Sequence, residues 1–369
     1  MIQDLFIIGA TGKVGKTLID QIVRKEDTNS QVHRNPTRIV GLASSRNFIF
    51  SPHGISPEVS YSFANKQCSE MREYNTLDEL LEAVNNSHRN EESTLVFVDV
   101  TSVNEPITQF HLRVIRSKPY GIVTANKNPI ALSGYDTFQE LTRNPRRYGY
   151  RCSVMAGAEA VTFLQDLSDL SDNLQLIEGC FSGTLGYITS ELEKSRKFSD
   201  ILREANKRGY TEPHPRDDLN GLDVARKLVV LARTAGYPIS VSDVKVSPFI
   251  PPEYFLENNP ESFLNAVARL DDKFSEKVAR ARSDGLTLRY VARMDIKDTN
   301  PTVEVSLKEV PKQSPLGVLE GTMNKIVIVS ETYPNGYSVE APGAGLDVTA
   351  RNIRRDLLYL LDTRETRMR

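Results

Sequence analysis

The chain begins with an apolar strand that leads through a glycine turn into an amphipathic helix. Asp4–Ile8 has the pattern of a buried strand, Gly9–Gly15 is Gly-Ala-Thr-Gly-Lys-Val-Gly, and Lys16–Lys25 carries apolar residues at helical spacing. In such a turn the backbone N–H groups and the helix dipole face a pyrophosphate, and glycines let the phosphates approach closely. We therefore expect a bound dinucleotide, with a purely structural turn as the alternative. The expected contacts are Gly9, Thr11, Gly12, Lys13, Val14 and Gly15.

Strands and helices continue to alternate up to about residue 150. Leu77–Val84 and Phe110–Ser117 have helical patterns, whereas residues 51–75 are rich in Pro, Ser and Asn and look irregular. The strand-like segments are Arg38–Ala43, Thr94–Val100 and Gly121–Thr124. Thr94–Val100 is continuously β-prone, as in parallel strands covered on both faces. The alternation predicts an α/β fold with a doubly wound parallel sheet of the Rossmann type.

Beyond residue 150 the pattern changes to one of helices and antiparallel strands. We expect a strand at Gly149–Val154 and one long helix at Asn220–Ala235. Pro342–Leu361 is a second glycine turn that leads into a helix. That helix packs on the nucleotide-binding part, or its backbone touches the cofactor, or both. The expected antiparallel strands are Leu286–Met294, Thr302–Glu309 and Asn324–Ser330.

Composition and charge argue against several classes of function. The formal net charge is −2, so the chain lacks the basic stripe that nucleic acids require. The longest apolar runs are strand-sized, and the N-terminus does not resemble a signal peptide, so neither a membrane nor secretion is expected. Cys68, Cys152 and Cys180 are widely spaced, as in a reduced cytoplasmic protein. The five histidines form no ligand cluster, so no metal site is expected.

The end of the second strand bears on the choice of cofactor. An acidic residue there would bind the ribose 2′-hydroxyl of NAD, whereas a cation would meet the 2′-phosphate of NADP. This chain has Ser44, Ser45 and Arg46 and no carboxylate. The sequence therefore favours NADP, with NAD possible and with a solvated Arg46 as the alternative.

Other polar residues follow strands or turns at which ligands bind in such sheets. Lys127 follows the strand Gly121–Thr124, and Thr101 follows Asp99 at the end of another strand. A surface lysine is the alternative for Lys127. Thr184 begins a helix, where a capping role is favoured over a hydrogen bond to a substrate.

The segment 209–227 concentrates charge in a Pro-rich loop that runs into a helix. It holds Glu212, Asp217, Asp218, Asp223 and Lys227. The last two are four residues apart and share one helix face. If they are buried, they form a proton-handling pair with a tunable pKa. If they are exposed, they form an ordinary surface ion pair of little energetic weight.

These features together resemble the homoserine dehydrogenase family. The most specific match is Gly-Tyr-Thr-Glu-Pro-His-Pro-Arg-Asp-Asp-Leu-Asn-Gly-Leu-Asp-Val-Ala-Arg-Lys at 209–227. The resemblance implies NAD(P)-linked interconversion of L-homoserine and L-aspartate 4-semialdehyde, in threonine and methionine biosynthesis, by a cytoplasmic homodimer without a fused aspartate kinase or ACT domain. It divides the 369 residues into a Rossmann domain at 1–150, an α+β catalytic and dimerisation domain at 151–340, and a C-terminal helix at 341–369 that returns to the Rossmann domain.

The resemblance also assigns roles to residues. Lys227 is expected to donate the proton, Lys127 to act as a second cation at the reacting oxygen, and Asp223 to take part in catalysis and in substrate binding. The other substrate-binding residues are expected to be Glu212, Asp218, Thr184 and Tyr210. Thr101, Lys127, Gly209 and Gly345 are expected to line the cofactor, with Arg46 and the first glycine turn.

The segment Arg151–Glu159 departs from the family pattern. An acidic residue that helps to hold a monovalent cation in the family is Arg151 here, and a proline is replaced by Glu159. We expect the cation site to be absent and the guanidinium to take its place. This departure keeps open an oxidoreductase that acts on another amino-acid aldehyde or ketone. A non-catalytic nucleotide-binding regulator is a further alternative, against which Lys127 and Lys227 argue.

Overall fold

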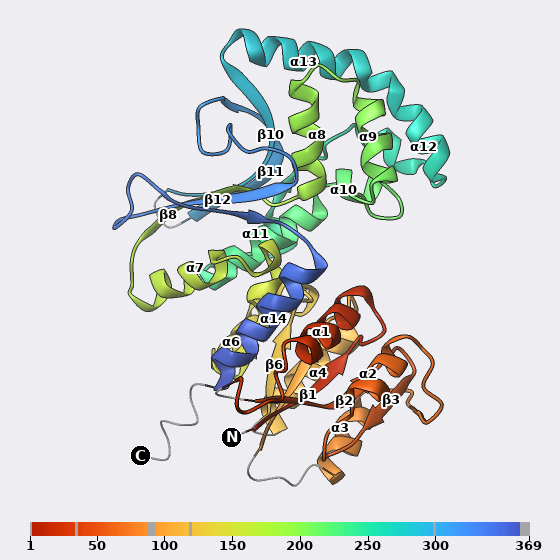
Figure 1. Cartoon of the computed structure of the whole chain (residues 1–369). Helices are drawn as coiled ribbons and strands as arrows, with labels where there is room; N and C mark the ends of the chain where they lie inside the picture. Colours follow the sequence, from red (N-terminus) through yellow and green to blue (C-terminus); the bar gives the residue numbers. More distant parts are fainter. Residues whose placement is uncertain (1, 34–35, 88–92, 118–119, 298–299, 362–369) are drawn as a thin grey trace. The chain divides into compact units, whose positions relative to one another are not determined.

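The computed structural model describes residues 2–33, 36–87, 93–117, 120–297 and 300–361. The chain forms two compact units (Figure 1). The first consists of Met1–Gly157 and Gly345–Arg369, and the second of Ala158–Ala344. The chain thus leaves the first unit once and returns to it with its last helix.

The first unit contains a seven-stranded sheet in the order β4-β3-β2-β1-β5-β6-β7. Five neighbouring strands of this sheet, β2, β1, β5, β6 and β7, run parallel to one another, which confirms the expected doubly wound sheet. β3 and β4 add an antiparallel edge that was not predicted, in and beside the segment expected to be irregular. The strands are β1 (Ile2–Ile8), β2 (Thr37–Ala43), β3 (Asn47–Phe50), β4 (Arg72–Glu73), β5 (Ser93–Asp99), β6 (Gly121–Thr124) and β7 (Tyr148–Gly149).

Helices cover this sheet, and the last helix of the chain is one of them. α14 packs beside α1, as the blue and red helices of Figure 1 show. Ile353 and Leu357 of α14 share a buried core with Leu18 and Ile22 of α1. The helices of this unit are α1 (Lys13–Arg24), α2 (Pro57–Ala64), α3 (Leu77–Ser87), α4 (Glu105–Ser117), α5 (Asn128–Ala131), α6 (Tyr135–Thr142) and α14 (Leu346–Leu361).

The prediction of a strand at Gly149–Val154 is wrong. β7 ends at Gly149, and the chain then forms two 3-10 turns, Arg151–Ser153 and Met155–Gly157. The backbone groups here bond to α14 instead of to a strand. The Arg151 N–H donates to Asp356 Oδ2 at 3.1 Å, and Asn352 Nδ2 donates to the Ala156 carbonyl at 2.7 Å. These side chains of α14 satisfy backbone groups that a neighbouring strand would otherwise have to pair.

The second unit is built on a six-stranded sheet in the order β13-β12-β8-β10-β11-β9. All of its neighbouring strands are antiparallel except β11 and β9. α8 and α11 pack on the central strand β10, so the unit has the expected α+β character. The strands are β8 (Leu174–Cys180), β9 (Lys245–Val246), β10 (Leu286–Lys297), β11 (Asn300–Pro311), β12 (Met323–Ser330) and β13 (Tyr337–Pro342).

The long helix expected at Asn220–Ala235 is confirmed as α11 (Leu222–Thr234), which begins directly after Gly221. This glycine has a φ of +78° and separates α10 from α11. A Cβ atom at this position would lie 2.1 Å from the Tyr290 hydroxyl oxygen, so only glycine fits. The helices are α7 (Ala160–Asp169), α8 (Gly183–Glu193), α9 (Phe198–Lys207), α10 (Arg216–Leu219), α11 (Leu222–Thr234), α12 (Pro260–Ala266) and α13 (Asp271–Ser283). Among the helices that the structure describes, none is long and apolar enough to span a membrane.

The packing of α14 predicts a difference between two of its residues. Ile353 is 0% exposed and Leu358 is 47% exposed. Ile353→Ala is expected to lower the free energy of unfolding of the first unit by about 2–5 kcal/mol, because it removes buried methyl groups and leaves a cavity. Leu358→Ala is expected to change it by less than about 0.5 kcal/mol. Denaturant unfolding of both variants measures the difference. Equal losses would show that α14 does not complete this core.

Candidate functional site

Four parallel strands of the first sheet end in register. Ile8 at the end of β1 pairs with Ala43 of β2 on one side and with Asp99 of β5 on the other. Asp99 in turn pairs with Thr124 of β6. The loops that follow these strands therefore start at one edge of the sheet, which is where ligands bind in open α/β sheets. The glycine turn, Arg46, Thr101 and Lys127 all lie in these loops.

The glycine turn after β1 has the geometry of an anion cradle. Gly9 adopts a φ of +90°, and its N–H donates to the Ala43 carbonyl at 3.0 Å. A Cβ atom on Gly15 would lie 2.4 Å from the Gly9 carbonyl oxygen, so helix α1 starts unusually close to the turn. Gly12 precedes the helix, and no side chain caps it in this described turn. The first N–H groups of α1 are thus suited to a phosphate.

Arg46 lies at the carboxyl end of β2, as expected, but in a tight hairpin. The Ser44 N–H donates to the Asn47 carbonyl at 2.8 Å, and β3 begins at Asn47. The Arg46 carbonyl accepts the Tyr74 N–H at 2.9 Å, so the backbone of the hairpin is held while the arginine side chain is exposed. An exposed guanidinium at this edge can pair with a phosphate.

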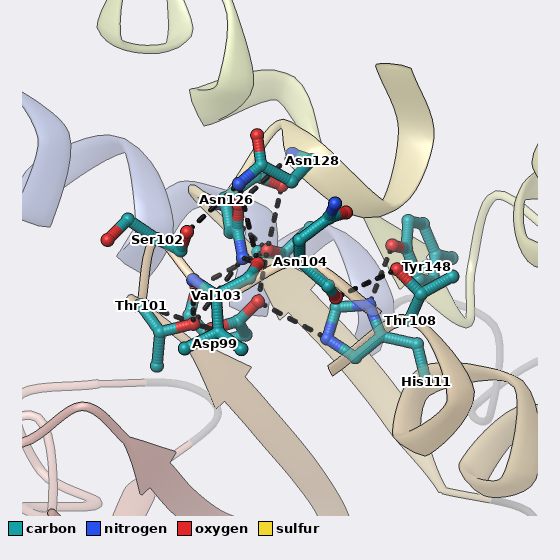
Figure 2. Close-up of polar contacts among 11 residues, drawn as sticks. Asp99, Thr101, Ser102, Val103, Asn104, Thr108, His111, Asn126, Asn128 and Tyr148 are labelled. Carbon is teal, nitrogen blue, oxygen red and sulfur yellow. Dashed lines mark hydrogen bonds and ion pairs between the residues drawn. The ribbon is translucent and has the colours of Figure 1, made fainter. Parts of the chain in front are cut away.

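The loops after β5 and β6 are joined to each other by two asparagines (Figure 2). Asn126 Nδ2 donates to the Val103 carbonyl at 2.8 Å, and Asn128 Nδ2 donates to the Ser102 carbonyl at 2.9 Å. Lys127 lies between these asparagines and is half-buried. The backbone of Lys127 is therefore fixed beside the Thr101 loop.

A buried polar chain behind the Thr101 loop was missed from the sequence. Asp99, His111 and Tyr148 are each 1% exposed. Tyr148 Oη lies 2.9 Å from His111 Nδ1, and His111 Nε2 lies 3.4 Å from Asp99 Oδ2 (Figure 2). The only signal in the sequence was a histidine at a core-facing position of α4, which is also typical of a histidine with a structural role.

In the second unit, four of the expected substrate-binding residues meet near the start of α8. Thr184 Oγ1 donates to Asp218 Oδ1 at 2.9 Å and lies 2.5 Å from the Tyr210 carbonyl oxygen. The Glu212 N–H donates to Asp218 Oδ2 at 2.8 Å. Asp218 is thus held by groups from α8 and from the loop after α9, and the exposed Glu212 lies next to it.

Burial raises the pKa of Asp218 to about 6. The negative charges of Glu212 and Asp223 act in the same direction, whereas the hydrogen bonds from the Glu212 N–H and from Thr184 oppose it. Burial has the largest effect because a carboxylate loses hydration inside the protein. This carboxyl group therefore changes its charge close to physiological pH.

Lys227 is anchored just before the start of α8. Its Nζ atom donates to the Phe181 carbonyl at 2.7 Å and lies 2.8 Å from Asp223 Oδ2. The side chain of Lys227 is 12% exposed and that of Asp223 is 45% exposed. The pair is thus neither fully buried nor a surface pair, since the ammonium group is sheltered and the carboxylate reaches solvent.

The two glycines expected near the cofactor lie in different units. Gly209 has a φ of +70° and follows α9 in the second unit, and Gly345 has a φ of +143° and precedes α14 in the first. Both are exposed.

Arg151 binds α14. Its Cζ atom lies 3.9 Å from the centre of the Tyr359 ring, and its Nη1 atom lies 3.8 Å from Asp356 Oδ1. Across the described ranges no group of three or more His, Cys, Asp or Glu side chains is placed to hold a metal ion.

Known proteins resemble this chain along nearly its whole length. The family model for homoserine dehydrogenase matches residues 161–358. The bifunctional aspartokinase/homoserine dehydrogenase of Daucus carota is 33% identical over 355 residues, which are 95% of this chain and 37% of that protein. The homoserine dehydrogenase of Saccharomyces cerevisiae is 29% identical over 371 residues, which are 97% of this chain and 98% of the yeast protein. The chain spans 37% to 43% of the length of the bifunctional relatives.

Solved structures share the fold. A Candida auris protein of unknown function matches with a TM-score of 0.85 and 28% identity, over 98% of this chain and 99% of its own. A hyperthermophilic archaeal homoserine dehydrogenase, solved in complex with NADPH, matches with a TM-score of 0.70 and 20% identity over 97% of both chains. The similarity to the archaeal enzyme shows that the two proteins share a fold.

Proposed function

Because the chain belongs to the homoserine dehydrogenase family, we propose that it reduces L-aspartate 4-semialdehyde to L-homoserine, reversibly and with a preference for NADPH. The observation that carries this proposal is the cluster at the start of α8. There a sheltered ammonium group on Lys227 and a carboxylate set formed by Asp218, Glu212 and Asp223 belong to the same unit. An amino-acid aldehyde carries a cationic ammonium group and an oxygen that gains negative charge on reduction, and the cluster offers a partner for each.

The amino group of the substrate binds Asp218 and Glu212 in this proposal, with Thr184 and Tyr210 lining the site. Lys227 Nζ donates a proton to the aldehyde oxygen, where alkoxide character develops. Asp223 pairs with Lys227 and, being half-exposed, connects it to solvent. Lys127 is a second cation for the same oxygen. The cofactor, when bound, supplies the hydride.

NADP fits the residues at the edge of the first sheet. The Gly9–Gly15 turn and the start of α1 would hold the pyrophosphate, and Arg46 the 2′-phosphate. Thr101, Gly209 and Gly345 would line the remainder. An archaeal homoserine dehydrogenase with this fold is described as a complex with NADPH, which supports the choice of cofactor. We further propose a cytoplasmic homodimer that serves threonine and methionine biosynthesis.

A second candidate is an oxidoreductase that acts on another amino-acid aldehyde or ketone. It is favoured by the Arg151–Glu159 segment, which departs from the family pattern and in which Met155 and Ala156 adopt positive φ values of +50° and +49°. We propose that Arg151 replaces a cation in this segment, supported by its contacts with Asp356 and Tyr359. Turnover with homoserine decides between the two candidates.

Oxidation of homoserine with NADP or NAD, followed by the absorbance of the reduced cofactor, tests the function and the role of Lys227. Lys227→Ala is expected to lower kcat by about 10²–10⁴-fold, the usual contribution of a general acid, and to leave NADPH binding intact. Lys194→Ala is the matched control, because it removes a lysine at the end of α8 whose side chain is 66% exposed. No turnover of homoserine by the wild type in either direction would refute the proposed activity, and a near-normal rate for Lys227→Ala would refute the role of Lys227.

The pKa of Asp218 predicts a pH dependence. Its carboxyl group must be ionised to bind an ammonium group, and its pKa is raised to about 6, so kcat/KM for homoserine is expected to fall as the pH decreases through about 6. Asp218→Asn should lower kcat/KM at pH 8 and abolish this acidic limb. Asp217→Asn, whose side chain is 55% exposed, should retain the limb. An unchanged limb in Asp218→Asn would assign it to another group.

Arg46 is expected to select the cofactor. Arg46→Asp should weaken NADPH binding and improve NADH binding, because a carboxylate repels a 2′-phosphate and accepts a hydrogen bond from a 2′-hydroxyl. The ratio of kcat/KM values for the two cofactors should shift toward NADH by about tenfold or more, as expected when a charge-assisted contact is lost. A constant ratio would show that Arg46 does not contact the 2′-position.

A further inference from the structure

The buried chain of Tyr148, His111 and Asp99 ends on the Thr101 loop. Asp99 Oδ1 accepts the Thr101 N–H at 2.9 Å and Thr101 Oγ1 at 2.7 Å. Asp99 Oδ2 accepts Thr124 Oγ1 at 3.2 Å. This carboxyl group therefore fixes both the backbone and the side chain of Thr101.

Tyr148, His111 and Asp99 are joined by one hydrogen bond and one contact at ion-pair distance. Tyr148 Oη and His111 Nδ1 share a hydrogen bond of 2.9 Å, whereas His111 Nε2 lies 3.4 Å from Asp99 Oδ2 without a hydrogen bond to any described residue. In the tautomer with a proton on Nε2, that proton faces the Asp99 carboxylate and Nδ1 accepts the Tyr148 hydroxyl proton. The pKa of the Tyr148 hydroxyl is raised well above its usual range, first by burial and then by the charge of Asp99, so Tyr148 remains a donor.

Thr101 is also in contact with the glycine turn. A Cβ atom at Gly9 would lie 3.1 Å from the Thr101 methyl carbon, so the two loops pack against each other. Asn126 Nδ2 lies 3.4 Å from Thr101 Oγ1, on the side of Lys127. Figure 2 shows Thr101 and Asn126 on one side of the network and Tyr148 on the other, with Asp99 and His111 between them.

We propose that Tyr148, His111 and Asp99 are positioning residues that set the affinity of the protein for the dinucleotide. They act through Thr101, whose placement against the glycine turn shapes the binding edge of the sheet. The proposal rests on the proposed function in taking NADPH as the ligand of this edge. None of the three residues needs to touch the cofactor.

A purely structural role explains the chain less well. The residues come from β5, α4 and β7, and Phe97 and Phe110 pack beside them. An apolar trio would fill this space without the desolvation of a carboxylate, and replacing buried polar groups with apolar ones is often neutral or stabilising. What the polar chain provides instead is a unique orientation of Asp99, and hence of Thr101.

Tyr148→Phe tests the proposal, because it removes one hydroxyl group and keeps the ring. The Kd for NADPH, measured by fluorescence, is expected to rise about threefold to tenfold, the effect of about one lost hydrogen bond. The same change in a Thr101→Val background is expected to raise Kd by a smaller factor, because the route through Thr101 Oγ1 is then absent while Asp99 still accepts the backbone N–H of residue 101. A mere loss of stability would act equally in both backgrounds.

Two further variants control for folding. Tyr290→Phe removes a buried hydroxyl that donates to the Ser247 carbonyl at 2.9 Å in the second unit, and it should leave the Kd for NADPH unchanged. His111→Gln places an amide N–H where Nε2 stands, so it should retain more affinity than His111→Leu.

The outcomes separate this inference from the proposed function. An unchanged Kd in Tyr148→Phe, or an equal rise in both backgrounds, overturns the inference even if homoserine is turned over. Equal affinities of His111→Gln and His111→Leu also overturn it, as does a wild type that binds no NADPH. Normal NADPH binding with the expected coupling but no turnover of homoserine overturns only the proposed function.

Discussion

The common register of β2, β1, β5 and β6 is the constraint on which the first unit depends. Because parallel strands are hydrogen-bonded side by side, the pairing of Ala43, Ile8, Asp99 and Thr124 makes four loops begin at one edge. The strand register alone, without any contact between loop side chains, thereby places segments that are distant in the sequence next to each other. The glycine turn, Arg46, Thr101 and Lys127 owe their proximity to this register.

The strand register does not fix the conformation of the loops that follow the strands. Polar groups behind this edge of the sheet fix it. Asp99 holds Thr101, and Asn126 and Asn128 join the two loops on either side of Lys127. Buried polar groups carry a desolvation penalty unless they are paired, so such a network is rigid when all of its members are satisfied. The scaffold thus presents its loops in one conformation.

In the second unit, groups at the start of α8 orient the charged side chains of the candidate site. The Phe181 carbonyl orients Lys227 of α11, and the Thr184 hydroxyl orients Asp218 of α10. α10 and α11 meet at Gly221, whose positive φ turns the chain between them. An ammonium group and a carboxyl group from two helices are therefore arranged around the beginning of a third.

The sequence by itself determined the parallel core of the first sheet, the glycine turn, the α+β character of the second unit and the family, because periodicity and a motif at 209–227 are local properties of the chain. Only the tertiary structure decided that residues 151–157 form turns on α14, and that His111 and Tyr148 join Asp99. Each of these depends on a partner far away in the chain, such as Asp356 or Asp99. A pattern of neighbouring residues carries no information about such a partner.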